Sequence, residues 1–270
     1  MINVETARCT GCEICVEVCP AYCLEMDSST GKPFQLPPSA ARCILCGHCI
    51  AVCPHGALSE DTMESADAPE IAGEKLPSAE SVDLLMRSRR SIRKFRKNSI
   101  PHELLEQLLD TARYAPTAVN AQKVQWRVYE NRSAVRQLAV LTNDWMRDLA
   151  EREENSARAA KLRRLDERWR EGIDWALRDA PHLIIAYGNP QGRSDGIIAL
   201  TYLELYAASM GLGTCWAGYL TAAAAGYSPL QEVLSLPDGE VLFGGLMMGY
   251  SQYRYLRLPE RKPLQCDWVR

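Results

Sequence analysis

Most of the cysteines in this chain lie in two runs with the same spacing. Eight of the 11 are in CTGCEICVEVCP (residues 9–20) and CILCGHCIAVCP (residues 43–54), and both runs read C-x2-C-x2-C-x3-C-P. Thiolates bind zinc or iron, and paired thiols can form disulfides. Zinc sites usually join two separated C-x2-C pairs, and disulfides need an oxidising compartment, for which the sequence gives no signal. Both alternatives are therefore weaker than an iron–sulfur site.

The repeat resembles the two-cluster bacterial-type ferredoxins over residues 5–60. This resemblance implies two [4Fe–4S] clusters, each held by three cysteines of one run and the last cysteine of the other. The expected ligands are Cys9, Cys12, Cys15 and Cys53 for the first cluster, and Cys43, Cys46, Cys49 and Cys19 for the second. Cys23 is an additional thiol, which we expect to be buried. His48 and His55 flank the second run and are expected beside the second cluster, where either could hydrogen-bond a cluster sulfur or face solvent.

A second segment has the composition of an anion-binding site. RSRRSIRKFRK (87–97) holds six arginines and lysines before Lys97, interleaved with two serines. Guanidinium groups bind phosphate oxygens in pairs, and a serine hydroxyl adds a further hydrogen bond. The alternative, a solvated basic surface, is not excluded by composition. No G-x-G-x-x-G follows an expected strand and no G-x-x-x-x-G-K-[ST] occurs, so neither a dinucleotide-binding fold nor a P-loop is predicted.

Four motifs in order resemble the FMN-dependent nitroreductase family over residues 80–265. They are RRSIRKF (89–95), APTAVNAQ (115–122) before a tryptophan-led strand, MGLGTCWAGY (210–219), and VLFGGLMMGY (241–250) followed by RLPERKP (257–263). The resemblance implies a homodimer with FMN at the subunit interface. It also implies an oxidoreductase that reduces a small electron-poor acceptor, such as a nitroaromatic, a quinone or an activated alkene.

The resemblance also implies which residues form the flavin site. The phosphate and the ribityl chain would be held by Arg89, Arg90, Ser91 and Arg93, and from the tail by Arg261 and Lys262. The partner subunit would contribute Pro116, Thr117 and Asn120. The isoalloxazine ring, with a backbone N–H near its N5, would be lined by Cys215, Trp216, Ala217 and Gly218.

Other residues of this domain are open to two interpretations. Cys215 could be a nucleophile or a packing residue, and its implied place beside the flavin favours packing. The charged segment 145–170 is expected to be mostly a solvated helical surface. Trp145, Trp169 and Trp175 are candidates for the walls of a substrate pocket, although aromatic residues at helical spacing are more often core residues.

The scaffold that positions these motifs is expected to be α+β. It would comprise a small ferredoxin-like two-cluster domain (1–60), an acidic, aperiodic linker (61–80) and a nitroreductase-like α+β sandwich (81–270), in which helices flank a central, mostly antiparallel sheet. Expected strands are 126–130, 182–188 and 241–250. Expected helices are 81–90 with Ser81 as its N-cap, 100–116, and 195–211, while 132–178 is largely helical. Helix 195–211 is apolar almost all round, which fits the core of a dimer.

Composition narrows the class of function. The chain has 270 residues, of which 47% are apolar, and a net charge of −3, so we expect neither a nucleic acid nor a membrane surface as a partner. No apolar run reaches the roughly 18 residues of a membrane helix and no secretory signal is present, so a cytoplasmic location is expected. Each cluster exchanges one electron at a time, so we expect a low-potential one-electron donor such as ferredoxin. Two alternatives stay open: an electron-transfer module serving a partner protein, and a related flavoenzyme such as a dehalogenase or dehydrogenase.

Overall fold

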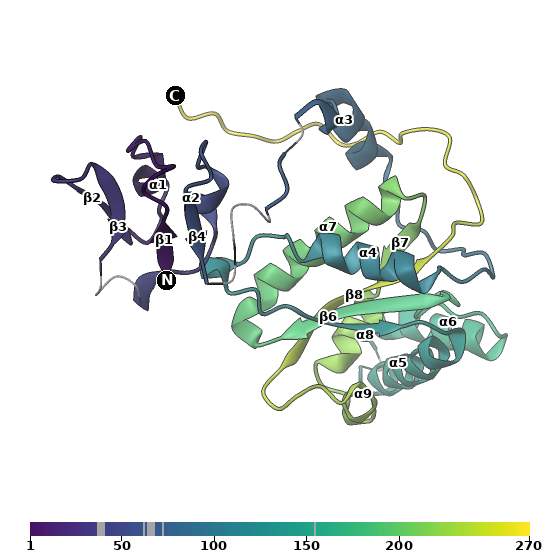
Figure 1. Ribbon diagram of the computed structural model, residues 1–270. Helices are drawn as coiled ribbons and strands as arrows, with labels where there is room; N and C mark the ends of the chain where they lie inside the picture. Colours follow the sequence, from purple (N-terminus) through teal and green to yellow (C-terminus); the bar gives the residue numbers. More distant parts are fainter. Residues whose placement is uncertain (37–40, 62, 64–67, 72, 154) are drawn as a thin grey trace. The chain divides into compact units, whose positions relative to one another are not determined.

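The chain folds into two compact units, which a computed structural model describes over residues 1–36, 41–61, 63, 68–71, 73–153 and 155–270 (Figure 1). The N-terminal unit comprises Met1–Leu76 together with Ala118–Ala121, and the C-terminal unit comprises Pro77–Thr117 and Gln122–Arg270. The linker expected at 61–80 lies partly outside the described residues, at 62, 64–67 and 72. Within the described chain, none of the helices is both long enough and apolar enough to cross a membrane.

The N-terminal unit repeats its local structure along with its sequence. The two cysteine runs carry short helices at equivalent positions, α1 (Ile14–Glu17) and α2 (His48–Ala51). Strand β1 (Ile2–Val4) pairs antiparallel with β4 (Leu58–Glu60), and β2 (Leu24–Asp27) with β3 (Lys32–Gln35). A 3-10 turn, η2 (Gly73–Lys75), follows. The equivalent residues Leu24 and Leu58 are both buried in a small core that also contains Cys15 and Ile50.

The C-terminal unit is built on one four-stranded antiparallel sheet, in the order β5–β6–β8–β7 (Figure 1). Its strands are β5 (Gln125–Tyr129), β6 (His182–Gly188), β7 (Gly213–Trp216) and β8 (Val241–Gly249). Three of them match the expected strands to within a residue, and β7 lies inside the motif at 210–219. The predicted antiparallel sheet is therefore confirmed.

Helices cover both faces of this sheet (Figure 1). One face carries α4 (His102–Ala112) and α7 (Arg193–Ser209), and the other carries α5 (Arg132–Arg152), α8 (Gly218–Ala224) and α9 (Ser228–Leu234). Leu183 and Ile185 of β6 point into one core, and Ile184 and Ala186 point into the other. Burial on both faces explains why this strand is a continuous apolar run. The predicted α+β sandwich is confirmed.

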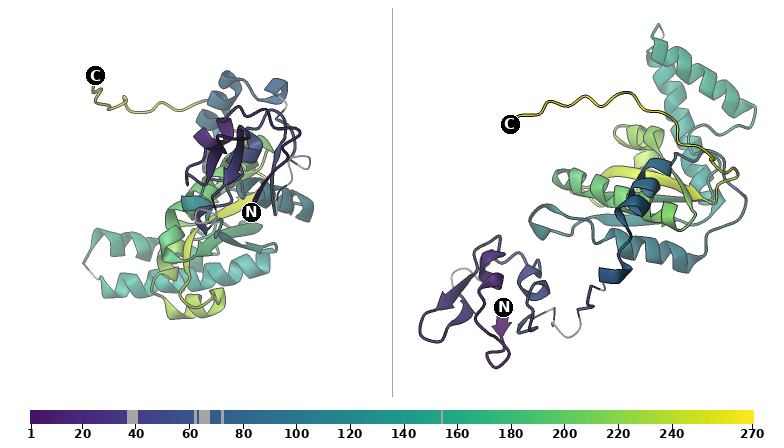
Figure 2. Two further views of the ribbon diagram at one scale, coloured as in Figure 1. Left: turned by 60° about the vertical axis from the view of Figure 1, so that its left-hand side comes forward. Right: turned by 90° about the horizontal axis from the view of Figure 1, so that it is seen from above.

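Helix α6 (Ala157–Arg170) pairs with α5 as a hairpin, seen in teal at the upper right of Figure 2, right. Two 3-10 turns, η3 (Ala118–Asn120) and η4 (Pro190–Gly192), complete the elements. The close approach of α7 to β8 requires a glycine, because a Cβ at Gly196 would lie 2.1 Å from Cδ2 of Phe243.

The start of helix α3 (Ala79–Ser88) corrects one expectation. Ser78, and not Ser81, is its N-cap: Ser78 Oγ accepts the backbone N–H of Ser81 at 3.2 Å. The helix therefore begins before the expected residue 81, because the Ser78 hydroxyl satisfies an N–H of the first turn that would otherwise lack a partner.

Candidate functional site

Two cavities in the N-terminal unit gather the eight cysteines of the runs in the crossed arrangement that the resemblance to two-cluster ferredoxins implies. Three cysteines of the first run share a cavity with the last of the second run, and the reverse holds for the other cavity. The first cavity is lined by Cys9, Cys12, Cys15 and Cys53, and the second by Cys19, Cys43, Cys46 and Cys49. All eight are free thiols.

The thiols in each cavity fit an iron–sulfur cluster. A [4Fe–4S] cluster takes four cysteines, because each ligates a different iron atom, and each cavity is lined by four cysteines of the two runs. The residues present therefore fit two [4Fe–4S] clusters, with Cys9 and Cys43 each beginning one set.

Left-handed backbone turns recur at equivalent positions in the two runs. Gly11 and Leu45 have φ angles of 74° and 50°, and Glu13 and Gly47 have φ angles of 66° and 70°. In each pair only one residue is glycine: Gly11 in the first run and Gly47 in the second. Only glycine adopts this conformation without steric cost. The shared conformation bends the chain between successive cysteines, so the backbone shape and not the residue type is what the repeat preserves.

Each run also places a backbone N–H against the sulfur of its last cysteine. Cys23 N donates to Cys19 Sγ at 3.2 Å, and Ala57 N donates to Cys53 Sγ at 3.3 Å. Cys23 is 1% exposed, as expected for a buried thiol, and burial raises its pKa to about 11. Hydrogen bonds to cluster sulfurs are one determinant of reduction potential, so Cys23 and Ala57 act through their backbone.

The two histidines beside the second run lie in different cavities. His48 lines the cavity of Cys43, whereas His55 lines the cavity of Cys9, so the expectation that both flank the second cluster is wrong for His55. The reason is the crossing of the chain, which carries the end of each run to the other cluster.

The loop that the resemblance implicates in flavin binding has strained backbone. Val119, Asn120 and Gln122 have φ angles of 48°, 54° and 49°, and Thr117 Oγ1 accepts the N–H of Gln122 at 3.0 Å. Positive φ is rare for β-branched residues such as valine and is concentrated at functional sites. Pro116 immediately precedes this loop.

Asn120 belongs to the N-terminal compact unit although the chain on both sides of Ala118–Ala121 belongs to the other unit. Its side-chain amide donates to the backbone oxygens of Ile44 and Leu45, at 3.1 and 3.0 Å. These two carbonyls lie between Cys43 and Cys46, two of the four cysteines that line the second cavity. Within the N-terminal unit, Asn120 is therefore hydrogen-bonded to the cysteine loop of that cavity.

The basic segment divides between two cavities of the C-terminal unit. Arg89 and Arg90 line a cavity of about 390 Å³ together with Thr214 of β7 and Arg254 of the tail. Arg93 instead lines a cavity of about 440 Å³. The segment is fixed against β7 by a β-bridge from Ser91 to Thr214 and by Ile92 N, which donates to Thr214 O at 2.7 Å.

A buried carboxylate that the sequence analysis missed organises this region. Glu204 of α7 is 6% exposed and accepts from Arg89 Nη1 at 3.0 Å, from Thr214 Oγ1 at 3.2 Å and from Trp216 Nε1 at 3.2 Å. Charged side chains are rarely buried unless they are paired. The available signal was a single glutamate inside an otherwise apolar helix.

The segment expected under the isoalloxazine ring forms one wall of the larger cavity. Cys215, Trp216 and Gly218 all line it. Ala217 is 1% exposed and its N–H donates to Gly245 O at 2.8 Å, so this N–H is not available to a flavin. Burial raises the pKa of Cys215, with smaller opposing contributions from Arg93 and Arg178, which disfavours the thiolate that a nucleophile would need.

Two of the three tryptophans considered as pocket walls line the larger cavity, Trp145 and Trp175. Trp169 instead packs under Arg136, whose guanidinium carbon lies 3.8 Å from its ring centroid. Arg261 and Lys262 lie in the exposed tail, and neither is among the described residues that line the two cavities. In this structure Arg254 is the tail cation beside Arg89.

The larger unit has the dimensions and chemistry to hold FMN. One cavity is lined by three arginines, which suit a phosphate, and the other combines aromatic and apolar side chains, which suit a planar ring, with four cations. The segment Arg89–Arg93 contributes to both.

Comparison with known proteins places both units. The profile of the Nitroreductase family matches residues 86–250, and that of the 4Fe-4S dicluster domain matches residues 8–57. No curated protein matches the chain significantly. A nitroreductase with bound FMN from Bacteroides fragilis NCTC 9343 is 20% identical, with a TM-score of 0.59 over 70% of this chain and 98% of that one.

Two further solved structures share the fold. A nitroreductase with bound FMN from Desulfitobacterium hafniense DCB-2 is 20% identical, with a TM-score of 0.57 over 70% of this chain and 98% of that one. A BluB-like flavoprotein from Clostridium difficile 630 is 19% identical, with a TM-score of 0.56 over 70% of this chain and 99% of that one. Because the family profile spans more than half of the sequence, the chain belongs to the nitroreductase family of FMN-dependent oxidoreductases, joined here to a 4Fe–4S dicluster domain.

Proposed function

We propose that this protein reduces a small electron-poor acceptor, such as a nitroaromatic, a quinone or an activated alkene, with electrons that enter through its own two clusters. The observation that carries the proposal is the pair of four-cysteine cavities in the same chain as a nitroreductase-family domain. Clusters of this type exchange one electron at a time, whereas reduction of these acceptors needs two. FMN, when bound, accepts single electrons and delivers a pair.

The residues of the chain bind and position the cofactors and the acceptor. Cysteine thiolates hold the clusters, and Arg89, Arg90 and Ser91 bind the FMN phosphate. Cys215 and Trp216 would support one face of the ring, and Arg93, which lines the same cavity, would stabilise negative charge on the reduced flavin. For a nitroaromatic the reaction is R–NO2 + 2 e⁻ + 2 H⁺ → R–NO + H2O, with electrons from a low-potential donor such as reduced ferredoxin and protons from water.

The second cluster is the proposed exit for electrons. Asn120 is hydrogen-bonded to the loop that bears Cys43 and Cys46, and the family resemblance gives the same asparagine to the flavin. A residue with both roles would link the cysteine loop of the second cluster to the flavin. The first cluster would then receive electrons from the donor.

A homodimer is part of the proposal. Helix α7 leaves Ile197, Ile198 and Tyr202 about two-fifths exposed, at 41%, 38% and 43%. An exposed apolar face of this kind on a helix whose other face is buried is typical of a subunit interface. In the dimer, Pro116, Thr117 and Asn120 would reach the FMN of the partner subunit.

The decisive experiment is cofactor analysis after anaerobic purification, followed by turnover. We expect about eight iron, about eight sulfide and about one FMN per chain. The protein reduced with dithionite should be reoxidised rapidly by a nitroaromatic or a quinone. A colourless protein, or one with zinc and no flavin, would refute the proposal. Reduced flavin that no small acceptor reoxidises would instead indicate an electron-transfer module.

The choice of electron donor provides a second test of the role of the clusters. Because the clusters are the proposed entry, NADH should bleach the flavin slowly and reduced ferredoxin should bleach it rapidly. Rapid bleaching by NADH would remove the role proposed for the clusters.

A further inference from the structure

The larger cavity of the C-terminal unit is lined by cations from three segments of the chain. Arg93 comes from the basic segment, Arg158 and Lys161 from α6, and Arg178 from the turn before β6. No acidic side chain is among the described residues that line this cavity. Arg93 is already assigned to the flavin, but Arg158, Lys161 and Arg178 have no part in the proposed FMN site. The proposed phosphate-binding arginines, Arg89 and Arg90, line a different cavity.

Two of these cations, Lys161 and Arg178, lie beside aromatic rings. Neither forms an ion pair with a carboxylate of the described chain, whereas Arg158 lies 3.3 Å from Glu153. The ammonium of Lys161 lies 5.9 Å from the ring centroid of Tyr219, and the guanidinium of Arg178 lies 4.2 Å from that of Trp175. Both cations therefore sit on aromatic rings at the cavity wall, where a planar ligand would meet ring and charge together.

Arg178 is held in place by a strained turn. Arg178 and Asp179 have consecutive φ angles of 61° and 51°. The carboxylate of Asp174, which is 4% exposed, accepts the N–H groups of Leu177 at 2.9 Å and of Asp179 at 3.1 Å. The hydrogen bonds of Asp174 therefore stabilise a strained left-handed turn, and this turn fixes the position of Arg178. Burial, with the nearby charge of Arg93, lowers the pKa of Arg178, and the charge of Asp174 opposes this shift.

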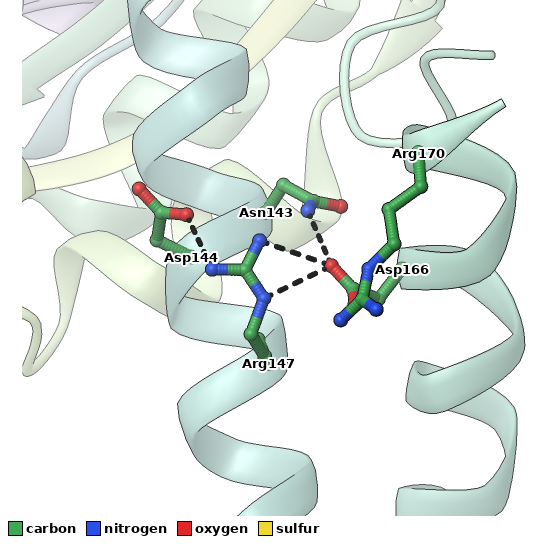
Figure 3. Close-up of polar contacts among 5 residues, drawn as sticks. All are labelled: Asn143, Asp144, Arg147, Asp166 and Arg170. Atoms are coloured by element: carbon green, nitrogen blue, oxygen red, sulfur yellow. Dashed lines mark hydrogen bonds and ion pairs between the residues drawn. The ribbon is translucent and has the colours of Figure 1, made fainter. Parts of the chain in front are cut away.

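The α5–α6 hairpin that carries Lys161 is rigidly cross-linked (Figure 3). Asp166 of α6 accepts from Arg147 Nε and Nη2, both at 3.1 Å, and from Asn143 Nδ2 at 3.1 Å, all on α5. Arg170 Nη2 contacts the other carboxylate oxygen at 2.7 Å. Although burial opposes ionisation, the hydrogen bonds of Arg147 and Asn143 lower the pKa of Asp166. The network fixes the register of α6, and so the place of Lys161 over the cavity.

We propose that the physiological acceptor is an aromatic anion, a ring bearing a carboxylate, whose charge is bound by Lys161 and Arg178 while its ring lies over the flavin wall at Cys215 and Trp216. This inference rests on the proposed function, because it names the class of acceptor for the same site. The two cations lie on the hairpin and on the turn, and Trp145 and Trp175 supply aromatic surface beside them.

The test compares a charged acceptor with its neutral ester on the anaerobically prepared holoenzyme. With dithionite as reductant, kcat/KM for 4-nitrobenzoate should exceed that for methyl 4-nitrobenzoate by about tenfold at low ionic strength, and salt should reduce the ratio. Lys161→Gln and Arg178→Gln should each lose about tenfold on the acid and leave the ester unchanged. Lys161→Arg should retain the preference.

A second readout measures binding without turnover. Benzoate should perturb the absorption spectrum of the oxidised flavin at lower concentration than benzamide, and Lys161→Gln should abolish this difference. Arg164→Gln is the matched control, because Arg164 is an exposed cation of the same helix that is not among the lining residues. Flavin content and circular dichroism of each variant show that it is folded and loaded.

The outcomes separate the two proposals. If the wild-type protein reduces the acid and the ester equally well, or if benzoate and benzamide bind alike, the anionic acceptor is wrong and the reductase function stands. If a holoenzyme with reducible flavin turns over neither compound, both proposals fail together.

Discussion

Arg89 and Glu204 form an ion pair of 3.0 Å across 115 positions of sequence, with the glutamate side chain 8% exposed and the arginine 25% exposed. The pair joins the basic segment to the middle of α7. The same carboxylate accepts a hydrogen bond from the Trp216 indole at the wall of the larger cavity. One buried acid therefore sets the position of an arginine in one cavity and of a tryptophan in the other.

Replacing this acid should weaken both stability and flavin retention. Glu204→Gln leaves the half-buried guanidinium of Arg89 without its counter-charge, which we expect to cost about 1–3 kcal/mol in the free energy of unfolding. The dissociation constant of FMN should rise about tenfold, because Arg89 and Trp216 lose their fixed positions. Thermal melting and flavin titration measure the two effects. Glu232→Gln, an exposed residue of α9, is the control and should change neither.

Loss of one cluster and loss of flavin should be separable. Cys46→Ser should lower the iron content from about eight to about four atoms per chain and leave FMN bound. Arg89→Ala combined with Arg93→Ala should do the reverse. Iron and flavin analysis of each variant tests this, with Cys266→Ser in the exposed tail as the control. Loss of FMN in Cys46→Ser would contradict the prediction that a cluster can be lost without loss of the flavin.

Asn120 should control the rate at which electrons reach the flavin. Asn120→Ala removes both hydrogen bonds to the carbonyls of Ile44 and Leu45. We expect the cluster-to-flavin step, followed by stopped-flow absorption with reduced ferredoxin, to slow about tenfold. Iron content should be unchanged, and Asn98→Ala at an exposed site should behave as the wild type. An unaltered rate in Asn120→Ala would remove the proposed exit route.

Acid should destabilise the folded chain through His182. This side chain is 1% exposed, and its Nε2 accepts the N–H of Ile100 at 2.7 Å, so the imidazole is held neutral. Burial lowers its pKa below the ordinary 6.5. The unfolded chain therefore binds a proton in the window below pH 6.5 that the folded chain does not, and stability falls as pH falls, by at most about 1.4 kcal/mol per pH unit.

Variants of two histidines test the direction in which stability changes with pH. The gap in melting temperature between pH 7.5 and pH 5.5 should shrink in His182→Gln, which keeps an acceptor for Ile100. His102 is exposed, and its hydrogen bond to Glu130 raises its pKa, so His102→Gln should lose a small stabilisation at pH 5.5 instead. A gap that is the same in His182→Gln and the wild type would contradict the role of His182.

Local spacing was enough to predict three ligands of each cluster, because cysteines separated by two residues are necessarily neighbours in space. The fourth ligand of each cluster comes from the other run, and it was predicted from the resemblance to two-cluster ferredoxins and not from spacing. Strand β6 could also be predicted from the sequence, because a strand buried on both faces is a continuous apolar run. Helix α9 lacked such a signal and was not predicted, and the start of α3 depended on which of two serines capped it.

The pairings that define the larger site were decided by tertiary structure. Nothing local to Glu204 indicates that Arg89 and Trp216 converge on it, because the three lie on different elements. The charges of α6 looked like a solvated surface, since charge spacing on one helix does not say which side faces a cavity. Only the Asp166 network and the strained turn at Arg178 orient Lys161 and Arg178 toward one cavity. Sequence determines chemistry where neighbours in the chain are neighbours in space, and folding determines it where the contacts are long-range.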